Sequence, residues 1–187
     1  MPALAVIAEP LLSQAHARRI AAVRRRCDPR FATVPPHVTL VFPIAVADPA
    51  AARATVAGIA GCAGAVTARF AGATRLRTAG PRGWLVMLRV DGGAGALARL
   101  HHRLAIGPFR GNRRGTAPYR PHLTAAAGLT APVATRLARR LGRWPAMPCR
   151  FAALGLVSWD GRRLERLATV RLGAAAPHDP SLMPFSR

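Results

Sequence analysis

The sequence contains no lysine and very few acidic residues. Its 28 basic residues are all arginines and stand against seven acids, which gives a formal net charge of +21 over 187 residues. The seven carboxylates are scattered, and no two follow a DxD or ExxE spacing. Two-metal nucleases and paired-carboxylate glycosidases need clustered carboxylates, so the sequence argues against both classes. The positive charge predicts an anionic partner: a nucleic acid, a phosphorylated small molecule or an acidic surface.

Cysteines are also scarce, and long hydrophobic runs are missing. Cys27, Cys62 and Cys149 are far apart and form no CxxC pair, so we expect reduced packing cysteines and no metal site. No apolar stretch approaches the roughly 18 residues of a membrane-spanning helix, and the N-terminus lacks the basic start of a signal peptide. We therefore expect a cytoplasmic monomer that needs no cofactor.

Apolar periodicity and turn residues predict alternating strands and helices, as in an α+β fold. Strands are expected at residues 3–8, 37–42, 65–71 with an extension at 74–78, 84–90, 119–126, 149–158 and 163–171, and helices at 11–26, 48–60, 94–105 and 131–142. The order of elements repeats at an offset of about 80 residues. We predict one bilobal domain over residues 1–172, with two pseudo-symmetric lobes of antiparallel sheet plus helices around a central cleft. Residues 173–187 are expected to form a loose tail.

One short motif occurs twice. Residues 36–40 read Pro-His-Val-Thr-Leu and residues 121–125 read Pro-His-Leu-Thr-Ala, each on a predicted strand. Residues i and i+2 of a strand point to the same face. His37 therefore projects with Thr39, and His122 with Thr124, while the residues between them face apolar packing. The two pairs are expected to face each other across the cleft.

Two imidazoles and two hydroxyls in a positively charged cleft suit phosphodiester chemistry without a metal. A neutral histidine can act as general base, and a protonated one can donate to the leaving oxygen. The hydroxyls of Thr39 and Thr124 can hydrogen-bond the non-bridging phosphate oxygens. Arg120, two residues before His122, shares that face if the strand extends through Pro121, and would add charge-assisted contacts to phosphate.

PPHVTLVFP at 35–43 and YRPHLTAAAG at 119–128 resemble the paired His-x-Thr motifs of the 2H phosphoesterase superfamily. The nearest branch resembles the bacterial 2′-5′ RNA ligase family of RNA 2′,3′-cyclic phosphodiesterases, and the resemblance spans roughly residues 1–172. It implies hydrolysis of a 2′,3′-cyclic phosphate, at an RNA end or on a nucleotide, to a 2′-phosphomonoester. It also implies that His37 is the proton donor and His122 the acceptor. Ala125 departs from the pattern, since a larger aliphatic residue is common there.

Three alternatives remain at the level of sequence. The two histidines could be strand residues that only bond the backbone. The chain could be a basic RNA- or nucleotide-binding protein that uses the same cleft without turnover. The same acid–base pair would also serve the reverse reaction, 2′-5′ ligation of RNA ends.

Other residues have ordinary explanations. We expect His101 and His102 to be surface or interface residues, because adjacent helical positions diverge. The arginines at 24–26 are expected on a solvated helix face, with RNA-backbone contact as the alternative. The three tryptophans are expected in the core or between the lobes. Tyr119, beside the second motif, is a candidate substrate contact through base stacking.

Overall fold

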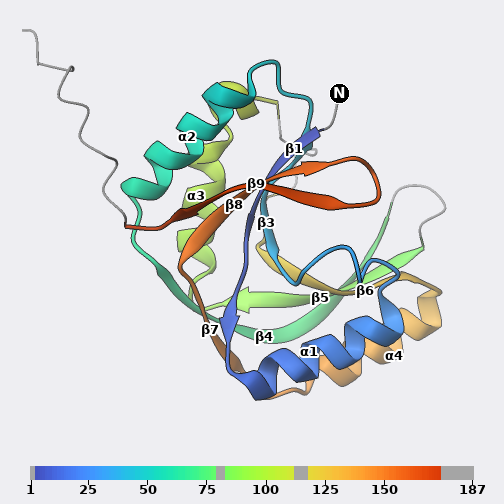
Figure 1. Ribbon diagram of the computed structural model, residues 1–187. Coiled ribbons are helices and arrows are strands. Elements are labelled where there is room, and N and C mark those ends of the chain that lie inside the picture. Colours follow the sequence, from blue (N-terminus) through green and yellow to red (C-terminus); the bar gives the residue numbers. More distant parts are fainter. Residues whose placement is uncertain (1–2, 79–82, 112–117, 174–187) are drawn as a thin grey trace, which may run out of the picture.

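Nine antiparallel strands form one continuous curled sheet in the computed structural model, which describes residues 3–78, 83–111 and 118–173 (Figure 1). Across the sheet the strands run in the order β2-β7-β4-β5-β6-β3-β1-β8-β9. Their bounds are β1 Ala3–Ala8, β2 Leu11–Leu12, β3 Val38–Ile44, β4 Val66–Arg77, β5 Trp84–Asp91, β6 His122–Leu129, β7 Met147–Phe151, β8 Ala153–Trp159 and β9 Leu164–Arg171.

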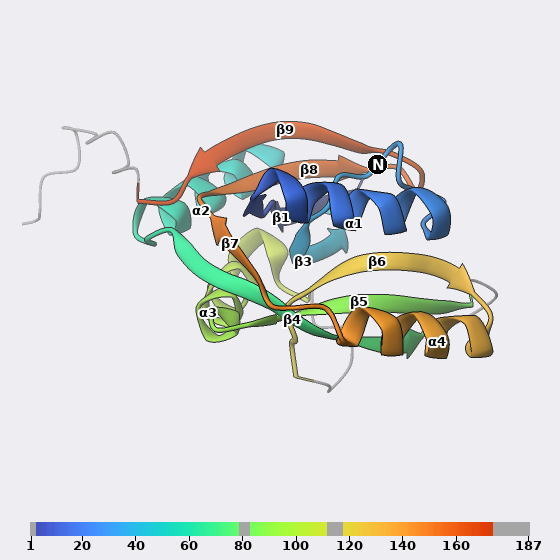
Figure 2. The same ribbon diagram turned by 90° about the horizontal axis from the view of Figure 1, so that it is seen from below.

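In the described ranges, four α-helices cover the outside of this curl (Figures 1 and 2). They are α1 (Gln14–Cys27), α2 (Pro49–Gly61), α3 (Ala94–Leu104) and α4 (Ala131–Gly142), with a short 3-10 turn at Gly107–Phe109. The helix starts follow local chemistry. The Asp48 carboxylate accepts the N–H groups of Ala50 and Ala51 at 2.9 and 3.0 Å, and Pro49 fills the first turn of α2, where its missing N–H costs nothing.

The sheet has two lobes, which confirms the predicted architecture, but the lobes are not successive halves of the chain. One lobe holds β3, β1, β8 and β9, with α2 packed on β8 and β9 and α3 packed on β3. The other holds β6, β5, β4, β7 and β2, with α4 packed on β4 and β5 and α1 packed on β6. The chain therefore passes between the lobes several times, a result that the repeated element order does not predict.

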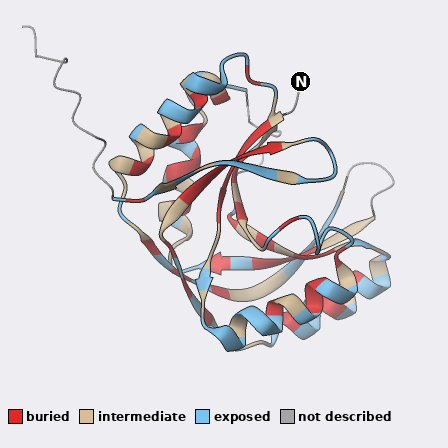
Figure 3. Ribbon diagram, viewed as in Figure 1, coloured by how far each residue is buried: buried red, intermediate tan, exposed pale blue. Residues whose placement is uncertain are grey.

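The lobes join at a narrow point. Strands β3 and β6 pair through a single pair of residues, Val38 and Leu123. Both side chains are fully buried in the main core. Figure 3 shows buried stretches, in red, along both the strands and the helices. This pair lies at the centre of the two repeated motifs, so the seam between the lobes and the candidate site coincide.

Several predicted boundaries shift. Leu11 and Leu12 form a strand paired with β7, and the helix begins after Ser13, whose hydroxyl accepts the His16 N–H. The stretch predicted as one strand at 149–158 contains two strands, β7 and β8, separated by Ala152. They lie near opposite edges of the sheet. The two pieces predicted at 65–71 and 74–78 are the single strand β4, whose register shifts at a bulge between Phe70 and Ala73.

The predicted tail lies outside the described residues except for its first member. Gly173 donates its N–H to the Ala60 carbonyl at 3.0 Å, and Leu172 donates to the Ala152 carbonyl at 2.9 Å. These bonds tie the end of β9 to α2 and to the start of β8.

Candidate active site

The two motifs occupy the same relative positions in the two lobes. In each, the residues on either side of the threonine are buried against the helices, namely Val38 and Leu40 on β3, and Leu123 and Ala125 on β6. The histidines and threonines alternate with them and are half-buried. They therefore face the concave side of the sheet, as the period-two pattern predicts.

The register brings the two pairs together. Because β3 and β6 are antiparallel and pair at Val38 and Leu123, His37 lies beside Thr124 and His122 beside Thr39. The four side chains are thus related by a pseudo-twofold axis through the Val38–Leu123 pair. The two histidines are close enough for the charge of His122 to lower the pKa of His37.

Both imidazoles are oriented by the same backbone contact. The Nδ1 atom of His37 lies 2.8 Å from the Pro35 carbonyl oxygen, and that of His122 lies 2.8 Å from the Arg120 carbonyl oxygen. A carbonyl only accepts, so Nδ1 donates in both rings, and Nε2 is the atom left for chemistry. No residue in the described parts of the chain hydrogen-bonds either Nε2. The backbone bonds that one alternative invoked are therefore present, and they orient each ring with its Nε2 atom free of hydrogen bonds among the described residues.

Burial is the main influence on the pKa of both histidines. It lowers the pKa of both histidines, because desolvation disfavours the charged ring, while the backbone hydrogen bond opposes the shift in each. Around His37 the charged neighbours have mixed effects. The Arg24 guanidinium lowers the pKa of His37, and the Glu9 carboxylate raises it.

The second motif is held to the first by Tyr119. Its hydroxyl donates to the Thr39 carbonyl at 2.8 Å, and its ring stacks on His101 at 4.0 Å between centroids and 11° between planes. Burial raises the pKa of the phenol well above its usual range. The ring and hydroxyl that sequence analysis offered to a substrate base are thus engaged inside the protein, and Tyr119 connects the lobes.

His101 corrects a prediction, because it is a buried residue and not a surface one. It is 7% exposed, and its Nδ1 lies 2.6 Å from the Leu40 carbonyl oxygen on β3. Helix α3 therefore supports the first motif from behind. His102, its neighbour, is exposed as expected. Leu97, Leu100 and Leu104 define the apolar face of α3, and His101 lies on that face at helical spacing. This spacing is the sequence signal that could have separated His101 from His102.

Arg24 corrects a second prediction. It belongs to the run of three arginines on α1, but its side chain is 3% exposed while Arg25 and Arg26 are exposed. It forms an ion pair with Asp28 at 2.8 Å and donates to the Val34 carbonyl at 2.7 Å. This contact fixes the segment that leads into the first motif, three residues before His37.

Charged residues that sequence analysis did not select flank both histidines. Glu9, just beyond β1, lies beside His37 and forms an ion pair with Arg166 of β9, whose side chain lies across Gly155 of β8. On the other lobe, Arg89 of β5 is directly paired with His122. Arg120 is exposed, and its carbonyl holds His122 as described above.

Most arginines have no acidic partner. The described residues contain three ion pairs, in which Asp28, Asp91 and Glu9 each hold one arginine. Asp48 caps α2, and Asp160 accepts the N–H groups of Arg162 and Arg163. These five carboxylates are thus committed to structure, and the excess positive charge of the described residues is left available on the surface.

The tryptophans are covered by arginines. Guanidinium groups stack over all three rings at 4.5–5.1 Å, as Arg75 on Trp84, Arg19 on Trp144 and Arg30 on Trp159. Trp84 and Trp144 also pack against the main core. Each tryptophan ring therefore has a cation–π partner within the protein.

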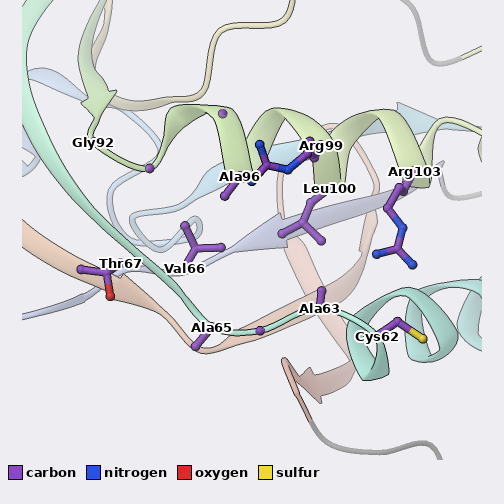
Figure 4. A pocket seen from close by; sticks show the side chains of 13 residues that line it. Cys62, Ala63, Ala65, Val66, Thr67, Gly92, Ala96, Arg99, Leu100 and Arg103 are labelled. Carbon is purple, nitrogen blue, oxygen red and sulfur yellow. The ribbon is translucent and has the colours of Figure 1, made fainter.

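A hollow of about 560 Å³ lies away from the paired motifs, between the end of α2, the start of β4 and helix α3 (Figure 4). Its lining includes Cys62, Thr67, Arg99 and Arg103, and none of the four motif side chains. Cys62 is exposed there, so it is not the packing cysteine that we expected.

Among the described residues, no group of three or more histidine, cysteine or acidic side chains is placed to hold a metal ion. No helix in the described part of the chain is long and apolar enough to cross a membrane.

Comparison with known proteins gives a consistent result. Residues 12–163 match the family model described as the 2′-5′ RNA ligase superfamily. Among solved structures, Escherichia coli LigT in complex with 3′-AMP aligns with a TM-score of 0.56 and 18% identity, covering 91% of this chain and 98% of LigT. No curated protein sequence is significantly similar.

Two further structures share the fold. TT0787 of Thermus thermophilus aligns with a TM-score of 0.60 and 19% identity, over 91% of this chain and 98% of its own. Usb1 of Kluyveromyces marxianus aligns with a TM-score of 0.55 and 13% identity, over 91% of this chain and 99% of its own. These likenesses extend over nearly the whole described chain, including both lobes.

Proposed function

Because the chain belongs to the 2′-5′ RNA ligase superfamily, which supports a phosphoesterase or ligase-type activity, we propose that it hydrolyses 2′,3′-cyclic phosphodiesters of RNA ends or nucleotides. The product is a 2′-phosphomonoester. The observation that carries the proposal is the arrangement of the two motifs about the Val38–Leu123 pair, with one free Nε2 atom in each imidazole.

The reaction needs one proton removed and one supplied. The neutral His122 takes a proton from water at Nε2 while the water oxygen bonds to phosphorus. The bond from phosphorus to the 3′ oxygen breaks, and the protonated His37 donates its Nε2 proton to that oxygen. Atoms and charge balance, and the two histidines exchange protonation states. Proton transfer through solvent restores them for the next turnover.

The remaining residues bind the phosphate. Thr39 and Thr124 stand beside the opposite histidine, so each hydroxyl can donate to a non-bridging oxygen while the neighbouring ring moves a proton. Arg120 is proposed to add a charge-assisted contact. Nothing in this scheme requires a metal or an organic cofactor. E. coli LigT has been crystallised with 3′-AMP, ATP and NADP+, which supports a nucleotide as the ligand here.

A cyclic-nucleotide assay tests the proposal. Purified protein is incubated with nucleoside 2′,3′-cyclic phosphates and with oligonucleotides ending in a 2′,3′-cyclic phosphate, in the presence of EDTA, and the position of the product phosphate is determined. We expect 2′-phosphomonoesters. His37→Ala and His122→Ala should each lower the rate by about 10²–10⁴-fold, and the double variant should lose little more than the worse single one.

Three outcomes would argue against this mechanism. Full activity in either alanine variant would remove the two-histidine scheme, and loss of turnover with EDTA that a divalent ion restores would remove the metal-free one. Binding of these ligands without any turnover would favour the non-catalytic binding protein. A nitrophenyl ester, whose leaving group needs little acid assistance, should rescue His37→Ala more than His122→Ala. The reverse would exchange the two roles.

A further inference from the structure

Arg89 lies beside the second motif on the same face of the sheet. It is the cross-strand partner of His122, and residues paired in this way point to the same side. The next partners along the two strands are Met87 and Thr124. Arg89 is exposed, while its neighbours Leu88 and Val90 are buried on the helix side. Its guanidinium therefore belongs to the concave face that carries the two motifs.

A glycine in the next strand makes room for this side chain. Gly72 of β4 lies in the bulge between Phe70 and Ala73 and has a φ of +73°. A Cβ at this position would lie 2.5 Å from the Arg89 Nη2 atom. The guanidinium thus rests on the surface of β4, two strands away from β6. Neighbouring strands are about 4.8 Å apart, so the charge is centred roughly 10 Å from the strand of His122.

Arg89 forms no ion pair within the described parts of the chain, although its charge is one of the minor causes that lower the pKa of Asp91. The carboxylate of Asp91 follows two residues later on the same face, and Arg69 holds it through two hydrogen bonds of 3.0 and 2.7 Å. No hydrogen bond or ion pair engages Arg89 among the described residues. A guanidinium with five donors and no ion pair, held over β4 at roughly 10 Å from the strand of His122, is suited to an anion that comes with the substrate.

We propose that Arg89 binds a second phosphate group of the substrate, one that does not react. The proposal rests on the proposed function, since it takes the phosphate between His37 and His122 as the reacting one. Thr39 and Thr124 already flank that phosphate, and the guanidinium lies beyond them, over β4. The site would thus favour substrates with two phosphates over a simple nucleoside 2′,3′-cyclic phosphate.

The second phosphate could come from either of two sources with the same chemistry. It could be the neighbouring phosphodiester of an RNA chain or the 5′-phosphate of a single nucleotide. Three substrates separate these: adenosine 2′,3′-cyclic phosphate, the same compound with a 5′-phosphate, and the dinucleotide ApA ending in a 2′,3′-cyclic phosphate. We expect the unaltered protein to have a higher kcat/KM for at least one of the two-phosphate substrates.

The test variant is Arg89→Gln, with Arg140→Gln as the matched control. Arg140 is an exposed arginine of α4, which covers the opposite face of β4 and β5. Arg89→Gln should lower kcat/KM for the preferred two-phosphate substrate by about tenfold or more, through KM, because one charge-assisted contact is lost. It should change kcat/KM for adenosine 2′,3′-cyclic phosphate by less than about twofold, within the range of a surface substitution. Arg140→Gln should leave all three unchanged.

The pattern of losses decides the proposal. A loss confined to the dinucleotide assigns the second phosphate to the RNA chain, and a loss confined to the 5′-phosphorylated nucleotide assigns it to a terminal phosphate. An equal loss on all three substrates would place Arg89 at the reacting phosphate, and no loss on any would leave it without this role. Either of these results overturns the proposal.

A binding measurement keeps this test separate from the proposed activity. Calorimetric titration compares adenosine 3′-monophosphate with adenosine 3′,5′-bisphosphate, neither of which needs turnover. We expect the bisphosphate to bind more tightly, and Arg89→Gln to remove most of that advantage. If the protein turned over none of the cyclic substrates, the proposed function would fail, and the bisphosphate advantage would still decide the role of Arg89. Equal affinities for the two ligands in the unaltered protein would overturn it.

Discussion

At the scale of single residues, the two histidines make the same backbone hydrogen bond but have different charged neighbours. Each ring donates Nδ1–H to the carbonyl two residues before it, and burial lowers the pKa of each. Glu9 and Arg24, with opposite charges, both influence His37. The proton donor must nevertheless be charged at the start of the reaction, and a bound anionic phosphate would favour that form.

The direction of these shifts predicts the pH dependence. The base must be neutral, so activity is lost as pH falls below the pKa of His122, and the acid must be protonated, so activity is lost as pH rises above that of His37. Burial lowers both pKa values below the ordinary value of about 6.5. We therefore expect a bell-shaped profile of kcat/KM with its maximum on the acidic side of 6.5. A maximum above pH 7 would contradict this account of the free protein.

Arg24 predicts a large effect on stability from one residue in an apparently uniform run. Arg24→Met leaves the Asp28 carboxylate and the Val34 carbonyl buried without their partner, which should cost about 3–5 kcal/mol. Arg26→Met, an exposed neighbour, should stay within about 0.5 kcal/mol. Urea unfolding of the three proteins measures both. Similar midpoints for the two variants would show that the buried pair does not stabilise the fold.

At the scale of elements, a glycine fixes the entry to helix α3. Gly93 precedes the helix, and a Cβ there would lie 2.5 Å from the Ala68 Cβ and 2.7 Å from the Thr67 carbonyl oxygen. The backbone of β4 cannot yield at that distance without moving the strand. Gly95, one residue into the helix, would meet only the flexible end of Arg99 at 3.6 Å.

These two glycines predict opposite effects of the same substitution. Gly93→Ala should destabilise the protein by about 1–3 kcal/mol, the usual cost of forcing atoms into a filled site. Gly95→Ala should stabilise it by about 0.5–1 kcal/mol, because alanine has less backbone freedom to lose in a helix. Thermal unfolding of both variants measures the difference. A stabilising Gly93→Ala would mean that α3 moves away from β4 without cost.

At the scale of the whole molecule, the net charge of +21 is the dominant feature. Three ion pairs use three of the acids among the described residues, and the other carboxylates there accept hydrogen bonds in caps, turns and strands. Most arginines in the described ranges therefore form no ion pair. A surface of this kind attracts polyanions through the release of the counterions condensed on them.

The charge predicts a difference between long and short ligands. Binding of an oligonucleotide should weaken steeply between about 50 and 200 mM salt, with a slope of log K against log salt set by the number of phosphates contacted. A mononucleotide contacts few arginines, so its slope should be shallow. Titrations at several salt concentrations give both slopes. An oligonucleotide affinity that does not change with salt concentration would show that the positive surface is not used for RNA.

The sequence by itself determined most of the elements and the residues of the two motifs at the candidate site. Period-two alternation placed His37 with Thr39 and His122 with Thr124 on one face of each strand, and Asp48 with Pro49 marked the start of α2. These are local properties, set by backbone geometry and by contacts a few residues away, so a single sequence can report them. The two motifs were also specific enough to indicate the family.

Only the tertiary structure decided which residues surround that site. The helical spacing of Ile20, Val23 and Cys27 places Arg24 nearer the apolar face of α1 than Arg26. That a charged side chain is buried there depends on packing against β6 and on the Val34 carbonyl ten residues away, which local spacing does not show. The order of strands in the sheet decides that Arg89 pairs with His122. It also decides that the chain passes between the lobes several times. Strand order is settled by the burial of whole faces against helices, a global balance that local spacing does not contain.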